Sequence, residues 1–357
     1  MSDGPQRLQP DVLKATVPDV RVFAMLLRSV SFSNRALMRI NGGGLQINVE
    51  ESPGRTLLAS VYIDRDIFDG YHYAPEDPPE EDQDGVVSTD LEIPLNILIQ
   101  CLNIFGSAVG SASTNFSSRR KPWKRQGEDS DSDGQGQNYG RGRMNGQDTN
   151  GRLDDYFSAD RRKGTSMRMS YAGKGEPLTL FLAEDDSGPT TTCKIATFDG
   201  EPPLERPFDD EAMVLKCILK SSWFRDALSE VDPSCEKLTF IGNPIAEKST
   251  GGRSKLQPPL RILADGTHGS SEMDFPSDKA VLETFECVEP VSFSYRFSHI
   301  SPMLRALQGS SKTSLRIDDE GLLCLQFLTE SQSPRSGIRR TVSSIVDFKC
   351  PALDEDV

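Results

Sequence analysis

The chain has 357 residues, of which 54 are acidic and 40 are basic, and its formal net charge is −14. This length predicts two domains, each large enough to bury its own core. The acidic balance argues against a protein that coats nucleic acid with a uniformly basic surface, because the phosphate backbone favours positive charge.

The seven cysteines are scattered along the chain, and no two of them form a CxxC pair. This spacing predicts reduced thiols in an intracellular protein rather than a disulfide framework or a zinc centre. The N-terminal residues lack the apolar core of a signal peptide, and no apolar run approaches the ~20 residues that span a bilayer. We therefore expect a soluble protein.

The first half begins, after a flexible N-terminus (1–14), with a strand at Ala15–Val17 and a helix over Val20–Phe32. The helix is predicted from apolar residues at helical spacing, which are Val20, Phe23, Leu27 and Val30. Runs in which apolar and polar residues alternate then predict antiparallel strands with one solvent-exposed face. These runs are Ala36–Ile40, Leu45–Glu50 and Arg55–Ile63, with a hairpin turn at Gly42–Gly44 and with Phe68–Tyr71 closing the meander.

A second helix is predicted over Leu95–Phe105, starting after Pro94 and containing no basic residue. From about residue 109 to 164 the composition changes to basic, then acidic, then Gly/Asn/Gln-rich, with few aliphatic residues, which predicts a disordered insertion. The basic cluster is either a nuclear-localisation or nucleic-acid-tethering signal or a solvated loop with incidental charge. It consists of Arg119, Arg120, Lys121, Lys124 and Arg125.

The chain then repeats itself. Thr165-Ser-Met-Arg-Met matches Thr313-Ser-Leu-Arg-Ile, and the strands Leu178–Leu182 and Leu323–Leu328 follow them. Gly309 and Thr313 are 4 positions apart whereas Gly106 and Thr165 are 59 apart, so the first copy carries 55 extra residues. An internal repeat of this kind predicts a duplicated α/β module with one long insertion.

The expected boundaries follow from this repeat. They place a first domain at 15–200, a connector at 201–211, a second domain at 212–351 and an acidic tail at 352–357. In the second domain a strand over Ala212–Leu219 leads into a helix over Ser221–Val231 with a serine cap. The further strands are expected at Lys237–Gly242, Leu260–Ala264, Ser270–Phe275, Phe293–Phe297 and Val342–Lys349.

The sequence contains few of the motifs that are typical of enzyme active sites. There are three histidines and no HExxH, CxxC or G-x-S-x-G motif, so we expect no catalytic residues, no metal and no cofactor. Carboxylates do cluster at four places, which are Asp64/Asp66, Asp90/Glu92, Asp185/Asp186 and Asp318–Glu320. Asp90 and Glu92 have the i, i+2 spacing that aims two ligands from a strand at Mg²⁺. The alternative, which we favour, is an exposed strand face, and the last two clusters fit turns.

Several segments in this order resemble DNA sliding clamps such as the proliferating cell nuclear antigen family. The resemblance is strongest to the Rad-one family, the subunits of that name in the nine-one-one DNA-damage checkpoint clamp. The segments are PLNILIQCLNIFGS, EPLTLFLAED, TTTCKI, FRDALSEVD, SLRIDDEGLLCLQF and the terminal VDFKCP. The resemblance implies an α+β fold of two similar βαβββαβββ domains, with helices lining the inside of a ring and antiparallel sheets outside.

The same resemblance implies a nuclear, non-enzymatic subunit of a heterotrimeric ring. Such a ring contains two other clamp subunits, is opened by a clamp loader, encircles double-stranded DNA without sequence preference and recruits checkpoint and repair proteins. A 3′→5′ exonuclease using Asp90 and Glu92 remains the alternative. The implied DNA-facing residues are Arg21, Arg28, Lys220, Arg225, Arg305 and Lys312. The implied subunit-interface residues are Thr190, Thr191, Thr192, Cys193, Lys194 and Ile195 in the first half, and Ser270, Ser271, Glu272, Met273, Asp274 and Phe275 in the second.

Overall fold

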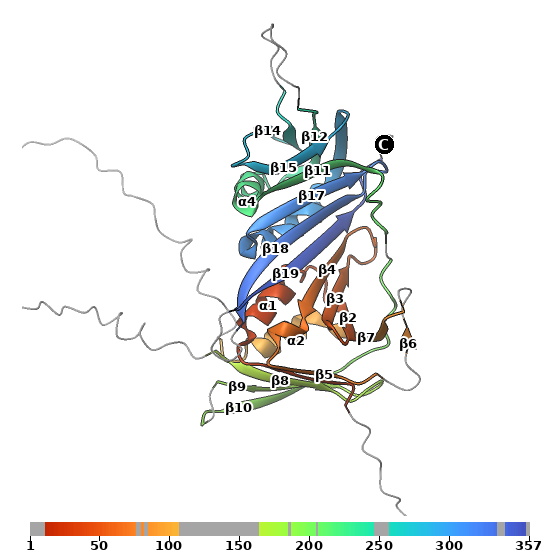
Figure 1. Cartoon of the computed structure of the whole chain (residues 1–357), viewed down its shortest axis with the longest axis vertical. Helices are drawn as coiled ribbons and strands as arrows, with labels where there is room; N and C mark the ends of the chain where they lie inside the picture. Colours follow the sequence, from red (N-terminus) through yellow and green to blue (C-terminus); the bar gives the residue numbers. More distant parts are fainter. Residues whose placement is uncertain are drawn as a thin grey trace, which may run out of the picture. The chain divides into compact units, whose positions relative to one another are not determined.

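The fold is seen in a computed structural model, which describes residues 11–75, 80–81, 85–106, 164–184, 187–204, 206–245, 257–333 and 340–354 (Figure 1). The basic cluster 119–125 and the acidic pair Asp185/Asp186 lie outside the described residues. In the described part, no helix is both long enough and apolar enough to cross a membrane.

Each half of the chain has two sets of strands and two main helices, which are α1 and α2 in the first half and α4 and α6 in the second. The first half contains β1 (Leu13–Val17), α1 (Val20–Ser29), β2 (Arg35–Asn41), β3 (Gly44–Glu50), β4 (Leu58–Asp64), η1 (Arg65–Ile67), β5 (Gly70–Tyr73), β6 (Glu80–Glu81), β7 (Val87–Pro94), α2 (Leu95–Leu102), β8 (Ser166–Tyr171), β9 (Leu178–Ala183) and β10 (Thr190–Ile195). The second half contains β11 (Met213–Lys220), α4 (Ser221–Ser229), β12 (Cys235–Gly242), β13 (Leu260–Gly266), β14 (Gly269–Phe275), β15 (Leu282–Cys287), β16 (Val291–Arg296), α5 (Phe297–Ile300), η3 (Ser301–Met303), α6 (Leu304–Gly309), β17 (Lys312–Asp318), β18 (Leu323–Ser333) and β19 (Arg340–Cys350).

The duplication predicted from the sequence is visible in the sheet topology. The strand order β10-β9-β8-β1-β5 in the first half has its counterpart in β19-β18-β17-β11-β15, and β4-β3-β2-β7 has its counterpart in β14-β13-β12-β16. Neighbouring strands within these sets are antiparallel, as the alternating sequence predicts. The Gly42-Gly43 turn between β2 and β3 is a hairpin, with Asn41 paired to Gly44.

One pair of strands joins the two halves. β19, at the edge of its five-stranded set, pairs antiparallel with β4, at the edge of the set β4-β3-β2-β7, to which the two-residue β6 adds a fifth strand beside β7, so that a ten-stranded sheet runs through both halves. The core below this joint contains Phe348, whose ring centroid lies 5.7 Å from that of Phe327 and 6.3 Å from that of Phe32. A second contact across the halves brings Nε2 of buried His299 to 3.3 Å from Oε2 of Glu51.

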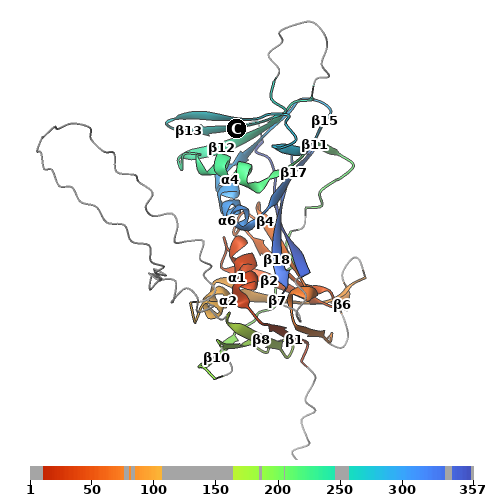
Figure 2. The ribbon, with the colours of Figure 1, turned by 60° about the vertical axis from the view of Figure 1, so that its left-hand side comes forward.

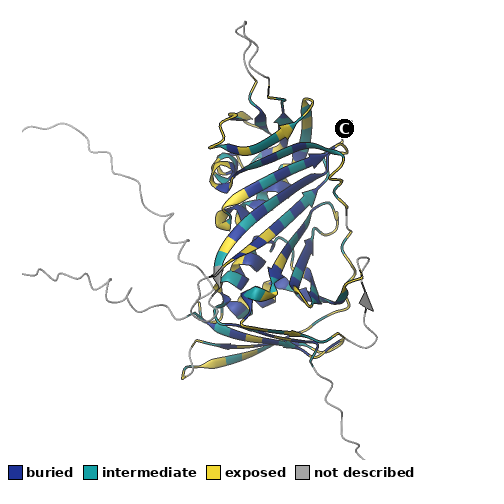
Figure 3. Cartoon of the chain, viewed as in Figure 1, coloured by how far each residue is buried: buried dark blue, intermediate teal, exposed yellow. Residues whose placement is uncertain are grey.

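The helices form one layer. α1 contacts α2 and α6, and α6 contacts α4, so the order across the layer is α2-α1-α6-α4 (Figure 2). Each helix buries one face against the sheets, and the strands alternate between buried and exposed residues (Figure 3). Phe23 of α1 and Phe224 of α4 are both completely buried, as expected for equivalent anchors of repeated helices.

Three local predictions were wrong. Strand β15 was missed, and β5 pairs with β1 in the other set of strands instead of closing the β2–β4 meander. Ser221 does not cap α4 from outside, because the N-cap is Lys220 and Ser221 is the first helical residue. The buried Ser221 hydroxyl lies 2.8 Å from Oγ1 of Thr313 and is satisfied there.

Candidate functional surfaces

The exposed face of the helix layer carries most of the cations expected to face DNA. Arg21 and Arg28 both lie on α1, where Arg21 is exposed and Arg28 is half-buried. Nε of Arg21 donates to Oδ2 of Asp19 at 2.8 Å, and these hydrogen bonds raise the pKa of Arg21. Burial lowers the pKa of Arg28. Asp19 is also the N-cap of α1, so this aspartate both starts the helix and offsets the positive charge of Arg21.

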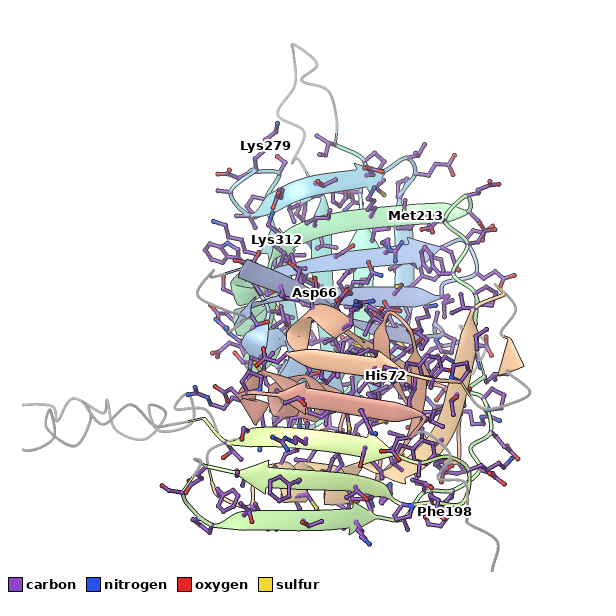
Figure 4. All side chains as sticks on the ribbon, turned by 60° about the horizontal axis from the view of Figure 1, so that its bottom comes forward. Asp66, His72, Phe198, Met213, Lys279 and Lys312 are labelled. Carbon is purple, nitrogen blue, oxygen red and sulfur yellow. The ribbon has the colours of Figure 1, made fainter. Side chains whose placement is uncertain are left out.

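The other four cations belong to the second half. Lys220 is exposed at the N-cap of α4, and Nε of Arg225 lies 3.4 Å from Oδ1 of its neighbour Asp226. Lys312, at the first position of β17, is labelled in Figure 4, and its Nζ lies 2.9 Å from Oε1 of Glu283 on β15. Exposed ion pairs of this kind contribute only about 0–1 kcal/mol, so a phosphate can replace the carboxylate at small cost.

Arg305 occupies a different environment. Its Nη1 donates to the carbonyl oxygen of Ser31 at 2.9 Å and lies 3.2 Å from the Ser31 hydroxyl. Arg305 is on α6 and Ser31 follows α1, so this guanidinium bridges the two halves of the chain. Arg305 was predicted from the family resemblance to face DNA, whereas no sequence pattern indicated this partner.

Apolar side chains interrupt the positive face of the helices. On α2, which lacks basic residues as predicted, Ile97 is 40% exposed, and Trp223 on α4 is 49% exposed. Met25 on α1 is also exposed. The helix layer is therefore a patchy surface of separated cations and apolar groups.

The two predicted interface segments are edge strands. Residues 190–195 coincide with β10, which has β9 as its one neighbour in the described sheet, and residues 270–275 lie in β14, whose one neighbour there is β13. Five of the seven β14 residues are exposed, and Arg261 on β13 binds two of its carboxylates. Nε of Arg261 lies 2.7 Å from Oδ1 of Asp274, and Nη1 lies 3.1 Å from Oε2 of Glu272.

The candidate metal ligands Asp90 and Glu92 are held by arginines of the neighbouring strand β2. Asp90 accepts two hydrogen bonds of 3.0 Å from Arg39, and Glu92 lies 2.9 Å from Nη1 of Arg35. Asp318 accepts the backbone N–H of Leu322 at 2.7 Å, as its predicted turn position implies. Among the described residues, no three His, Cys, Asp or Glu side chains are grouped closely enough to hold a metal ion.

The segment between the halves is bound to the face of the sheets opposite the helices. The residues that bind it could not be recognised from any motif in the sequence. Arg316 on β17 lies 4.9 Å from the Phe208 ring centroid and 2.7 Å from Oδ1 of Asp210. Near the beginning of this segment, the backbone N–H of Leu204 donates to Glu50 at 3.1 Å. Phe198, labelled in Figure 4, is 54% exposed.

All seven cysteines are free thiols. Burial raises the pKa of Cys217 and of Cys324 to about 12, so these two thiols are protonated at neutral pH and pack as small apolar groups.

The paired sets of strands with one helix layer define a sliding-clamp fold. The structure of proliferating cell nuclear antigen from Thermococcus kodakaraensis aligns with a TM-score of 0.59 over 96% of this chain and 100% of that chain, at 13% identity. The family model described as repair protein Rad1/Rec1/Rad17 matches residues 12–329, and the chain belongs to this family.

Two relatives span nearly the whole chain. The human cell cycle checkpoint protein RAD1 is 27% identical over 345 residues, covering 97% of this chain and 93% of that protein. The DNA repair exonuclease REC1 of Mycosarcoma maydis is 27% identical over 413 residues, covering 88% of this chain and 87% of that protein.

Proposed function

We propose that the chain is one subunit of a heterotrimeric ring clamp that encircles double-stranded DNA at damage sites or primer junctions and recruits checkpoint and repair proteins. The observation that carries this proposal is the duplicated topology. One edge pair, β19 with β4, is joined within the chain, while the equivalent strands β10 and β14 remain at sheet edges. Repeating the internal joint between chains forms a head-to-tail assembly that closes into a ring.

The helix layer is the surface that we assign to DNA. Its cations are spread over three helices, and two of them, Arg21 and Arg225, lie beside the carboxylates of Asp19 and Asp226, an arrangement suited to loose, sequence-independent phosphate contacts. We assign the second domain to 212–351 and the connector to 201–211, and we begin the first domain at residue 13 instead of residue 15, because β1 starts at buried Leu13, and end it at residue 200. The names of the checkpoint relatives support a role in the nucleus, and two other clamp subunits and a clamp loader are the partners that this role requires.

The DNA-facing role is tested with a pair of charge reversals. Combining Arg21→Glu with Lys220→Glu should cause several-fold faster loss of the assembled three-subunit ring from primed circular DNA. It should also reduce the slope of log retention against log salt by about one unit for each phosphate that the variant no longer binds. Retention is measured after loading, over a series of salt concentrations.

The matched control is Arg168→Glu with Lys216→Glu. These side chains alternate with buried neighbours on β8 and β11, which places them on the sheet face opposite the helices, and the change in charge is identical. The assignment is overturned if the helix and control variants leave DNA at the same rate.

We infer that the chain has no nuclease activity of its own, because Asp90 and Glu92 form arginine ion pairs instead of an open ligand set. Purified wild-type protein and Asp90→Ala should leave 3′-labelled DNA equally intact with Mg²⁺. A contaminating nuclease would act in both preparations. A wild-type activity that disappears in Asp90→Ala would favour the exonuclease named for the Mycosarcoma maydis relative.

A further inference from the structure

The internal joint shows what a favourable junction between two clamp halves looks like in this chain. Beside the β4–β19 pair, α1 packs against α6. A Cβ atom added to Gly309 of α6 would lie 3.2 Å from Sδ of Met25 of α1. The apolar side chain of Met25 therefore packs closely against the backbone of α6 at this glycine. Arg305 donates to Ser31 at the C-terminal end of α1, where a cation is favoured by the helix dipole.

α4 is the counterpart of α1 in the second half, as the edge strand β14 is the counterpart of β4. The α4–β14 end of the chain is therefore open where the α1–β4 end is joined, and the positions of α1 described above can be located on α4. Phe23 and Phe224 are both fully buried on the first turns of these helices, and Leu27 and Leu228 follow at the same interval. With this alignment Asp226 stands where α1 has Met25.

By the same spacing, Asp232 stands where α1 is followed by Ser31. Asp232 is exposed, and hydrogen bonds from Ser234 lower its pKa, which keeps the carboxylate ionised. Asp226 is 69% exposed beside Arg225, and an exposed contact of 3.4 Å leaves it available to another cation. The edge strand β14 adds Glu272 and Asp274 to the same end.

The other open end, formed by α2 and β10, has no matching cation on its helix. No charged residue occurs from Leu95 to Gly106, and the exposed side chains there include Ile97, Gln100 and Ile104. A junction of this end with the α4–β14 end of a second copy would leave Asp226 and Asp232 against an uncharged helix. Removing these exposed carboxylates from water is costly when the facing helix supplies no cation.

The strand part of such a self-junction is also weaker than the internal one. Ile195 and Cys350, the last residues of β10 and β19, pair with the first residues of β9 and β18, so Cys193 is equivalent to Phe348. Phe348 is fully buried at the internal joint, whereas the half-buried thiol of Cys193 fills much less volume. Less apolar area is therefore removed from water at β10.

We propose that the α4–β14 end of this chain binds a partner subunit whose facing helix carries lysine or arginine opposite Asp226 and Asp232, that the α2–β10 end binds a different, mainly apolar surface, and that the two ends do not join each other. The proposal rests on the ring function above and adds the chemistry of each partner. In this arrangement, charge at one junction and apolar contact at the other determine the order of the subunits in the ring.

The test is co-purification of the chain with the two other clamp subunits of the proposed ring. Asp226→Lys with Asp232→Lys should weaken the binding of one of the two subunits about tenfold or more and leave the other at wild-type strength. Raising the ionic strength from 0.1 M to 1 M shortens the screening length from about 10 Å to about 3 Å, and should release the same subunit first from the wild-type complex.

Asp319→Lys with Glu320→Lys, which reverses two exposed carboxylates of the β17–β18 turn, is the matched control and should retain both subunits. Loss of both subunits from the α4 variant with an unchanged melting temperature, or loss of neither, overturns the proposal. A complex formed by the chain alone in sedimentation overturns it too but leaves the ring function standing. A wild-type chain that binds neither subunit overturns the ring function and the proposal together.

Discussion

Replacing Phe348 with alanine should lower the free energy of unfolding by about 3–5 kcal/mol, the range for removing a large aromatic side chain from a packed core. Phe348 is completely buried, and its ring packs edge-on against Phe327 at an interplanar angle of 70°. It is also paired in register with Ala59 of β4, whose small side chain cannot fill the resulting cavity. The destabilisation therefore falls on the strand pair that holds the two halves together.

Ile345→Ala on the same strand is the control, because Ile345 is 47% exposed and points to the other face of the sheet. Its cost should stay within about 1 kcal/mol, since little apolar area is uncovered. Both values are measured by urea unfolding, followed by fluorescence and by far-UV circular dichroism. Equal effects of the two substitutions would contradict the role of Phe348 as the core of the joint.

The duplication could be predicted because it depends on local sequence patterns. The periodic apolar positions of α1 and the repeated TSMRM and TSLRI segments depend on near neighbours in the chain, so the repeat and the order of its elements could be read directly. Strand β15 was missed because its charged residues Glu283 and Glu286 mask a short alternation at the edge of a sheet.

The joint could not be predicted from such patterns. β4 and β19 lie nearly at opposite ends of the chain, and periodicity says which face of a strand is buried but not which strand lies beside it. The same limit applies to single side chains. Arg305 could be singled out from the sequence as a cation near the fourth helix, yet its hydrogen bond to Ser31 depends on how α6 packs against α1, which only the assembled sheets determine.

Replacing Gly44 with alanine should destabilise the protein by about 2–5 kcal/mol, because it combines backbone strain with a direct clash. Gly44 has a φ of 150°, and an added Cβ would lie 2.2 Å from the carbonyl oxygen of Ile63 on β4. The obstruction is backbone and cannot rotate away. Tyr71 donates its hydroxyl to the Gly44 carbonyl at 2.7 Å, so the displaced turn would also lose a side-chain anchor.

Gly42→Ala, two residues earlier in the same turn, is a close control because nothing lies within 4 Å of an added Cβ atom there. We expect it to change the free energy of unfolding by no more than about 1 kcal/mol in either direction, because restricting the unfolded chain slightly favours the folded state. β3 pairs with β4, and β4 pairs with β19, so the damage from Gly44→Ala should spread along the sheet to the joint. Hydrogen exchange should then show faster exchange of β4 amides, such as those of Val61 and Ile63, in Gly44→Ala but not in Gly42→Ala. Unchanged protection of these amides in both variants would mean that the turn folds independently of the joint.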